Sequence, residues 1–303
     1  MASKESAVAQ ALPFPLDLPT TRWWTKDTIA IVTGGNRGIG FALVKRLAEL
    51  GLTVVLTARD SSKGKEAVEA LKSIGLSNNV HFFPLDVSNP SSITRFVSWF
   101  EANFSALDIL INNAGVSFND IDENSVEYAE IVIRTNFYGP KLLTEALLPI
   151  FRRSSSVGRI INISSRLGLL NKLQNPSLRK MLMDENNLSE MQIEKIVTLF
   201  LEDVKNGTWK NGGWPHVWTD YAVSKLALNA YSVVLAKRYK NYGISVNCYC
   251  PGFTQTSMTK GKGKYTTDDA AKVAVNIALL PPQILPTGRF FTVSNSCGTF
   301  SKL

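Results

Sequence analysis

Residues 28–40 read TIAIVTGGNRGIG, and this stretch decides how the rest of the chain is interpreted. The run TIAIVTGG at 28–35 predicts a buried β-strand that enters a glycine loop, and the amphipathic segment FALVKRLAELG follows at 41–51. Glycines at 34, 38 and 40 let the backbone turn tightly and approach a pyrophosphate, which the positive end of a helix attracts. Such a loop is a simple tight turn or a dinucleotide site, and its place between strand and helix favours the dinucleotide site.

The rest of the chain repeats this alternation of short apolar runs and helix-period segments. Further strands are expected at 53–59, 80–87, 108–115, 158–165, 244–252 and 289–294. Strands that are apolar on both faces and alternate with helices form parallel sheets covered on both sides. The sequence therefore predicts an α/β fold of the Rossmann type, a doubly wound parallel sheet of about seven strands with helices on both faces.

One domain is predicted, with an extension and an insertion. Residues 1–27 form a proline-containing N-terminal extension whose Trp23 and Trp24 are placed to dock on the domain, which spans 28–300. The chain between Ser164 and Tyr221 is much longer than a strand–helix connection needs. A helical insertion over about 169–218 is therefore expected to cover the domain as a cap.

The segment NLSEMQIEKIVTLFLEDVKNG predicts a helix within this insertion. Ser189 and Gln192 have the spacing of a capping box at its start, and Gly207 marks its end. Its apolar stripe consists of Ile193, Ile196, Val197, Phe200 and Val204. A stripe at this spacing is more typical of core packing than of a cofactor site.

Composition argues against several classes of function. The chain has 303 residues, of which 45% are hydrophobic, and a net charge of +8, values typical of a globular protein. No long basic block occurs, so nucleic-acid binding is not expected. No metal site is expected either, because His81 and His216 are the only histidines and no ligand cluster surrounds them. No window could span a bilayer, and three cysteines without a disulfide pattern favour a reducing compartment.

The end of the second strand, Thr57-Ala58-Arg59, distinguishes between dinucleotides. A site for NAD usually places a carboxylate there to bind the adenosine ribose hydroxyls. Arg59 instead offers a planar cation that can stack on adenine and pair with a 2′-phosphate. Arg37 and Lys63 can join it, whereas Asp60 opens the next turn. This pattern predicts NADP(H).

A tyrosine and a lysine lie four residues apart in YAVSK at 221–225. On a helix this spacing places Tyr221 and Lys225 on one face. A neighbouring ammonium favours the phenolate and lowers the pKa of a phenol from its usual value near ~10. Taken alone, the pair is either an acid–base catalyst or a surface contact.

Five motifs in this order resemble the short-chain dehydrogenase/reductase family. They are the glycine loop, NNAG at 112–115, the asparagine of RTNFYG, the serine after INI and YAVSK. The resemblance runs from about 29 to 293. The long insertion before Tyr221 is most similar to the monomeric carbonyl-reductase-like branch, which includes plant menthone/neomenthol dehydrogenases and salutaridine reductase.

The resemblance implies a role for each catalytic residue. Tyr221 would protonate the carbonyl oxygen in reduction or act as the base in oxidation, and Lys225 would lower its pKa and hold the nicotinamide ribose. Ser164 would hydrogen-bond the substrate oxygen, and its spacing after INI favours it over Ser165. Asn136 would hold a water that links Lys225 to solvent.

The resemblance also implies a cofactor site built from several loops. Asp86 and Val87 should contact adenine, Asn113 should lie on the adenosine side, and the loop after 244–252 should lie beside the nicotinamide. The full predicted set is Gly34, Asn36, Arg37, Gly38, Ile39, Gly40, Arg59, Lys63, Asp86, Val87, Asn113, Tyr221, Lys225, Pro251, Gly252, Phe253, Thr254 and Thr256.

Together these features predict an NADP(H)-dependent oxidoreductase that reduces a ketone or aldehyde, or oxidises a secondary alcohol, on a hydrophobic small molecule such as a terpenoid. Candidates for the apolar pocket are Leu167, Leu169, Leu170, Trp214, Trp218, Phe253 and Met258. The alternative is a non-catalytic NADPH-binding sensor or scaffold, which the intact motifs argue against. A monomer is expected, because the insertion should cover the surface that relatives use to form tetramers.

Ser301-Lys302-Leu303 has the form of a peroxisomal import address. If the import receptor reads this tripeptide, the protein would lie in the peroxisomal matrix. The alternative compartment is the cytosol.

Overall fold

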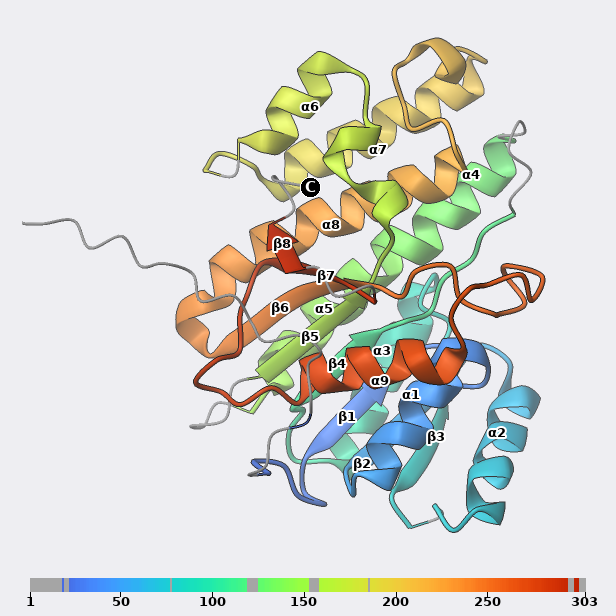
Figure 1. Ribbon diagram of the computed structural model, residues 1–303, viewed down its shortest axis with the longest axis vertical. Coiled ribbons are helices and arrows are strands. Elements are labelled where there is room, and N and C mark those ends of the chain that lie inside the picture. Colours follow the sequence, from blue (N-terminus) through green and yellow to red (C-terminus); the bar gives the residue numbers. More distant parts are fainter. Residues whose placement is uncertain are drawn as a thin grey trace, which may run out of the picture.

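The computed structural model describes residues 18, 22–76, 78–118, 125–152, 158–184, 186–293 and 297–299. Its centre is one sheet with strand order β3-β2-β1-β4-β5-β6-β7-β8 (Figure 1). The strands are β1 Ile29–Val32, β2 Thr53–Ala58, β3 Val80–Pro84, β4 Ile109–Asn112, β5 Gly158–Ile163, β6 Ile244–Cys250, β7 Arg289–Thr292 and β8 Cys297–Thr299. The predicted seven parallel strands are confirmed, and β8 adds an antiparallel partner to β7 that was not predicted.

Helices cover both faces of the sheet (Figure 1). Ile31 of β1 lies in the core on one face, whereas its neighbours Ala30 and Val32 lie in the core on the other, as strand alternation requires. The first core receives α3 Pro90–Asn103, α5 Gly139–Leu147 and α8 Thr219–Tyr239, and the second receives α1 Gly38–Glu49, α2 Ser61–Ser73 and α9 Thr267–Ala278. This arrangement confirms the doubly wound α/β fold.

The chain changes direction across the sheet between β1 and β4. These two strands are direct neighbours, with Ile31 opposite Leu110, while β2 pairs with the other side of β1. The loops that follow β1 and β4 therefore diverge and leave a crevice at the carboxyl edge of the sheet. Ligands of doubly wound proteins bind at this position.

The insertion is folded and helical. Its main helix, α7 Glu190–Lys205, begins with the predicted Ser189–Gln192 capping box, and all five residues of its predicted stripe are buried. A shorter helix, α6 Pro176–Met183, was not predicted, and Asn175 caps it. Single 3-10 turns complete the segment: η3 Arg166–Gly168, η4 Leu170–Lys172 and η5 Trp209–Asn211.

The insertion packs on the outer side of the helical layer. Helix α7 contacts both α8 and α4 Val126–Ile133. Lys141 of α5 forms ion pairs with Glu190 and Glu194 of α7, at 3.1 and 3.5 Å. The Lys141 side chain is largely buried, so solvent and salt screen these pairs less than pairs on an open surface.

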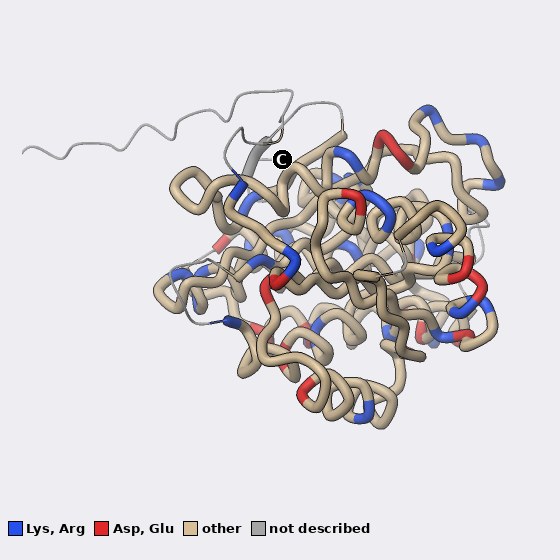
Figure 2. The backbone as a smooth tube through the Cα atoms, turned by 90° about the horizontal axis from the view of Figure 1, so that it is seen from below, with Lys and Arg blue, Asp and Glu red and all other residues tan. Residues whose placement is uncertain are grey.

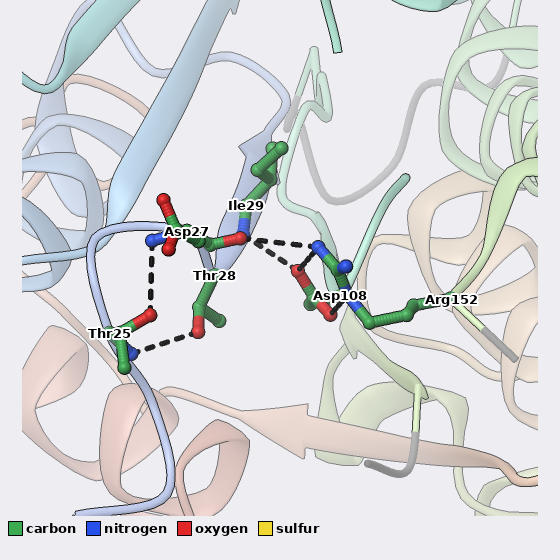
Figure 3. A network of polar contacts seen from close by, with 6 residues as sticks. All are labelled: Thr25, Asp27, Thr28, Ile29, Asp108 and Arg152. Carbon is green, nitrogen blue, oxygen red and sulfur yellow. Dashed lines mark hydrogen bonds and ion pairs between the residues drawn. The ribbon is translucent and has the colours of Figure 1, made fainter. Parts of the chain in front are cut away.

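A polar network fixes the start of β1, at the end of the strand away from the crevice (Figure 3). The carboxylate of Asp108 accepts a hydrogen bond from the backbone N–H of Ile29 at 2.9 Å and an ion-paired one from Arg152 Nε at 2.7 Å. Arg152 also donates to the carbonyl oxygen of Asp27. The turn at 25–28 is therefore anchored, and the other end of β1 leads into the glycine loop.

Trp23 and Trp24 dock on the domain, as predicted. The Trp24 side chain is buried and its indole N–H donates to the carbonyl oxygen of Leu50. The Trp23 indole donates to the carbonyl oxygen of Leu279. It also stacks on the guanidinium of Arg159, whose Cζ lies 3.5 Å from the Trp23 ring centroid.

Charged residues of both signs are mixed along the described chain. Figure 2 shows Lys and Arg interspersed with Asp and Glu. Among the described residues, no helix combines the length and apolarity needed to cross a membrane. Those residues also bring together no group of three side chains suited to hold a metal ion.

Candidate active site

The glycine loop has the close-packed geometry that a pyrophosphate site requires. Gly34 and Gly38 have φ values of +64° and +56°, in the left-handed region that other residues rarely adopt. A Cβ at Gly40 would collide with the carbonyl oxygen of Gly34. The amide of Asn113 braces the loop by donating to the carbonyl oxygens of Thr33 and Gly34, at 2.8 and 3.2 Å. The loop backbone is thereby held open toward the crevice at the start of α1.

A cavity of about 690 Å³ occupies this crevice. Every residue of the predicted cofactor set except Lys225 lines it. The backbone N–H of Gly35 donates to the carbonyl oxygen of Thr57 at 2.8 Å, so the glycine loop lies against the end of β2. Arg37 and Arg59 therefore share one region of the cavity, together with Lys63.

Tyr221 and Lys225 lie on the same side of α8, and burial is the main cause of the pKa shift of each side chain. Burial lowers the pKa of Lys225 to about 8, and its ammonium donates to the carbonyl oxygen of Ile163 at 2.9 Å. Burial raises the pKa of Tyr221 well above its ordinary value, and a hydrogen bond with Ser165 opposes that rise. Whether Lys225 lowers the pKa of Tyr221 when cofactor is bound stays a prediction. The ammonium lies 5.5 Å from the Tyr221 ring centroid.

The serine prediction also needs correction. The Ser164 hydroxyl is buried and donates to Asn229 Oδ1 at 2.5 Å, about two helical turns along α8 from Tyr221. Ser165 is the serine close enough to Tyr221 to influence its pKa, and its hydroxyl accepts a hydrogen bond from the N–H of Leu167 at 3.1 Å. The spacing after INI favours Ser164, yet its hydroxyl points toward Asn229 of α8.

The strand pattern could have identified Ser165. Side chains along a strand alternate between faces. Asn162 donates to Ser232 of α8, and Ser164 two positions later donates to Asn229 of the same helix. Ser165, one position further, therefore points away from α8 and lines the cavity beside Tyr221.

Asn136 lies in a single π-helical turn, η1 Arg134–Tyr138, between α4 and α5. Turns of this kind are rare and often occur at functional sites. The Asn136 side chain is fully buried, bonds the N–H and C=O of Val116 at 2.8 and 2.9 Å, and donates to Ser224. It therefore braces the loop after β4 against α8. Its predicted role in holding a water stays a prediction.

The apolar part of the cavity includes four of the seven predicted pocket residues: Leu167, Trp218, Phe253 and Met258. Leu169, Leu170 and Trp214 do not line it, because they are buried in the core beneath the insertion. Val217 and Arg166 line the cavity and were not predicted. Neither follows a motif or a periodic pattern, so only the folded insertion shows their place.

Comparison with known proteins now identifies the family. A family model described as short chain dehydrogenase covers residues 28–177 and 211–266. The chain belongs to the short chain dehydrogenase family.

Three relatives span nearly the whole chain. (+)-Neomenthol dehydrogenase of Arabidopsis thaliana is 39% identical over 284 residues, covering 87% of this chain and 95% of the relative. Carbonyl reductase [NADPH] 1 of Rattus norvegicus is 36% identical over 261 residues, covering 84% and 91%. The solved structure of salutaridine reductase from Papaver somniferum has a TM-score of 0.82 and 36% identity, covering 88% of this chain and 99% of that one.

These findings confirm several sequence-based predictions. The family and its carbonyl-reductase-like branch, the Rossmann-type fold, the oxidoreductase class and the NADP(H) cofactor are all confirmed.

Replacing Lys225 with methionine should stabilise the protein at neutral pH, because it removes a buried ammonium. Burial lowers the pKa of the native ammonium to about 8, whereas in the unfolded chain the lysine has its ordinary pKa of 10.5. The variant should gain about 2 kcal/mol in free energy of unfolding at pH 7, after allowing for the lost hydrogen bond. Because wild-type stability rises with pH between these two pKa values, the gain should shrink from pH 8 to 10.

Urea unfolding of both proteins at pH 7, 8, 9 and 10 measures this difference. Lys65→Met is the matched control, because Lys65 is exposed on α2, and it should show no such gain. A variant that is less stable at pH 7, or whose gain is unchanged at pH 10, would contradict the account.

Proposed function

We propose that this short chain dehydrogenase reduces a ketone or aldehyde on a hydrophobic small molecule with NADPH, or oxidises the corresponding alcohol with NADP⁺. The observation that carries the proposal is the placement of Tyr221 and Ser165 side by side in the cavity of about 690 Å³, with the buried Lys225 ammonium 5.5 Å from the Tyr221 ring centroid. The apolar wall beside them suits a substrate with one reactive oxygen.

The two hydroxyls suit the chemistry of carbonyl reduction. When bound, NADPH supplies the hydride, and negative charge then develops on the carbonyl oxygen. The Tyr221 hydroxyl is placed to donate its proton to that oxygen. The Ser165 hydroxyl, oriented by the N–H of Leu167, donates a second hydrogen bond to it. A phenol with a raised pKa remains protonated at neutral pH, as a general acid must.

The residues around the cavity fit the cofactor. The glycine loop allows backbone N–H groups to approach the phosphates, and α1 has no acidic residue in its first turn to oppose them. Arg37, Arg59 and Lys63 are the candidates to pair with a 2′-phosphate. We infer that Lys225 holds the nicotinamide ribose, and the position of its ammonium 5.5 Å from the Tyr221 ring centroid supports this role.

Arg59→Ala should raise KM for NADPH by about tenfold, because a hydrogen bond to a charged phosphate is lost. KM for NADH should change little, since NADH lacks that phosphate. Steady-state kinetics with both cofactors measures the effect. Arg95→Ala is the control, because Arg95 is exposed on α3 and does not line the cavity. An equal rise in KM for NADPH and NADH would show that Arg59 does not bind the 2′-phosphate.

The substrate class follows from the cavity wall and the relatives. Relatives named for neomenthol, salutaridine and isopiperitenone support an apolar, ring-containing carbonyl compound such as a terpenoid. A panel of terpenoid and aromatic ketones tests this directly. A sensor or scaffold would bind NADPH tightly but turn over none of them.

A monomer is the oligomeric state that we propose. Helix α7 packs on α4 and α8, and the ion pairs of Lys141 hold it there, so the insertion covers that side of the helical layer. Size-exclusion chromatography with light scattering tests this state. A tetramer mass would contradict it.

The compartment stays a prediction, since Ser301-Lys302-Leu303 lies outside the described residues. We propose peroxisomal import through this tripeptide, with the cytosol as the alternative. Localisation of the full chain with and without the three residues tests it. An unchanged cytosolic distribution of both would contradict the proposal.

A further inference from the structure

Trp218, the residue before α8, has an unusual backbone. Its φ and ψ are 50° and 57°, in the left-handed region. Among the described non-glycine residues only Trp218 and Lys260 have positive φ, and Lys260 lies in an exposed loop. For a bulky side chain this conformation is a true outlier, and such strain persists only where the surrounding structure imposes it.

The same turn carries two further costs. The Thr219 hydroxyl is buried and has no hydrogen-bond partner among the described residues. The Asp220 carboxylate is also buried, and its Oδ1 accepts a hydrogen bond from the N–H of Tyr221 at 2.6 Å. Three unfavourable features therefore precede Tyr221 directly. Clustering of this kind next to reacting groups is typical of segments shaped by function rather than stability.

The strained backbone places the indole against the reacting tyrosine. The Trp218 and Tyr221 ring centroids lie 6.0 Å apart, with an interplanar angle of 82°. Trp218 is only partly buried, and it lines the cavity together with Leu167 and Val217. An ordinary helical or extended backbone at 218 would direct the side chain elsewhere. The indole therefore forms an aromatic wall of the cavity beside the Tyr221 ring.

We propose that Trp218 determines substrate specificity, by providing the surface on which the flat apolar ring of a cyclic carbonyl compound packs while its oxygen meets Tyr221. This inference rests on the proposed function. Aromatic surfaces bind such rings through large buried area and preferred ring geometry. The left-handed backbone is retained because it aims the indole at that position.

Two variants distinguish the effect of the Trp218 indole from the effect of the left-handed backbone at this position. Trp218→Asn removes the indole, and asparagine tolerates a left-handed backbone, so this variant should melt no lower than the wild type. Trp218→Phe keeps an aromatic ring at the same place. The quantity measured is the ratio of kcat/KM for a bulky cyclic ketone to that for a small acyclic ketone.

The asparagine variant should lower this ratio by about tenfold, mainly through a higher KM for the cyclic ketone. The phenylalanine variant should restore most of it. A ratio unchanged within about twofold, or equal losses on both ketones, would overturn the proposal, since a purely structural role affects both alike.

A binding measurement separates this inference from the proposed function. Isothermal titration of the cyclic ketone into NADP⁺-loaded protein requires no turnover. If the wild type binds the ketone but does not reduce it when NADPH is supplied instead, and Trp218→Asn binds it about tenfold more weakly, the specificity role stands and the reductase proposal fails. Equal binding by both proteins, or no binding by the wild type, overturns the role of Trp218.

Discussion

Tyr221→Phe is expected to lower kcat for ketone reduction by about 10³-fold, because general acid catalysis contributes on that order. The change removes only the hydroxyl that meets the substrate oxygen and leaves the ring beside Trp218. NADPH affinity, measured by fluorescence titration, should change less than about threefold, since the phosphate-binding loops are untouched. Stopped-flow and steady-state consumption of NADPH give the rate.

The same helix offers a matched control. Tyr231 lies on α8, and its hydroxyl is buried without a hydrogen-bond partner among the described residues. Tyr231→Phe makes the same chemical change and should leave kcat unchanged, with equal or greater stability. If Tyr221→Phe keeps more than about a tenth of the wild-type rate, Tyr221 is not the general acid.

Ser165→Ala should lower kcat by about 10²-fold, as expected for loss of one hydrogen-bond donor to a developing oxyanion. Ser164→Ala should act on stability instead. It leaves Asn229 Oδ1 without its buried donor, which should cost about 1–3 kcal/mol of unfolding free energy. Parallel kinetics and urea unfolding of both variants test the assignment. A large kcat loss for Ser164→Ala with a nearly wild-type rate for Ser165→Ala would reverse it.

Local motifs made the cofactor site predictable. Gly34, Gly38 and Gly40 serve needs that are local to one turn, namely a left-handed backbone and close approach. Arg59 follows β2 directly, so its place at the cavity follows from the strand order alone. The capping box of α7 was equally readable, because both partners lie within four residues of each other.

The features that the sequence could not predict depend mostly on which side chains the fold buries. The spacing of Tyr221 and Lys225 indicates proximity, but the direction of a pKa shift depends on desolvation, which spacing does not contain. Leu170 and Trp214 are apolar residues near the site in sequence, yet the fold of the insertion turns them into its core. The strand β8 has only three residues, too few to show a periodic pattern.

Several features near the site lower stability without serving the core. The Lys225 ammonium is desolvated, Trp218 has a left-handed backbone, and the Asp220 carboxylate is buried. All three lie within α8 or at its start. Destabilising features concentrated at a reaction site are expected of an enzyme, because catalysis requires them there. A protein that only binds the cofactor would not require them.

The most direct test of the central claim is the rate of NADPH consumption by the wild-type protein with a panel of terpenoid and aromatic ketones, repeated with NADH. The account predicts turnover of at least one cyclic apolar ketone, with NADPH clearly preferred over NADH. Tight binding of NADPH without turnover of any ketone, aldehyde or alcohol in either direction would contradict it and favour a sensor or scaffold.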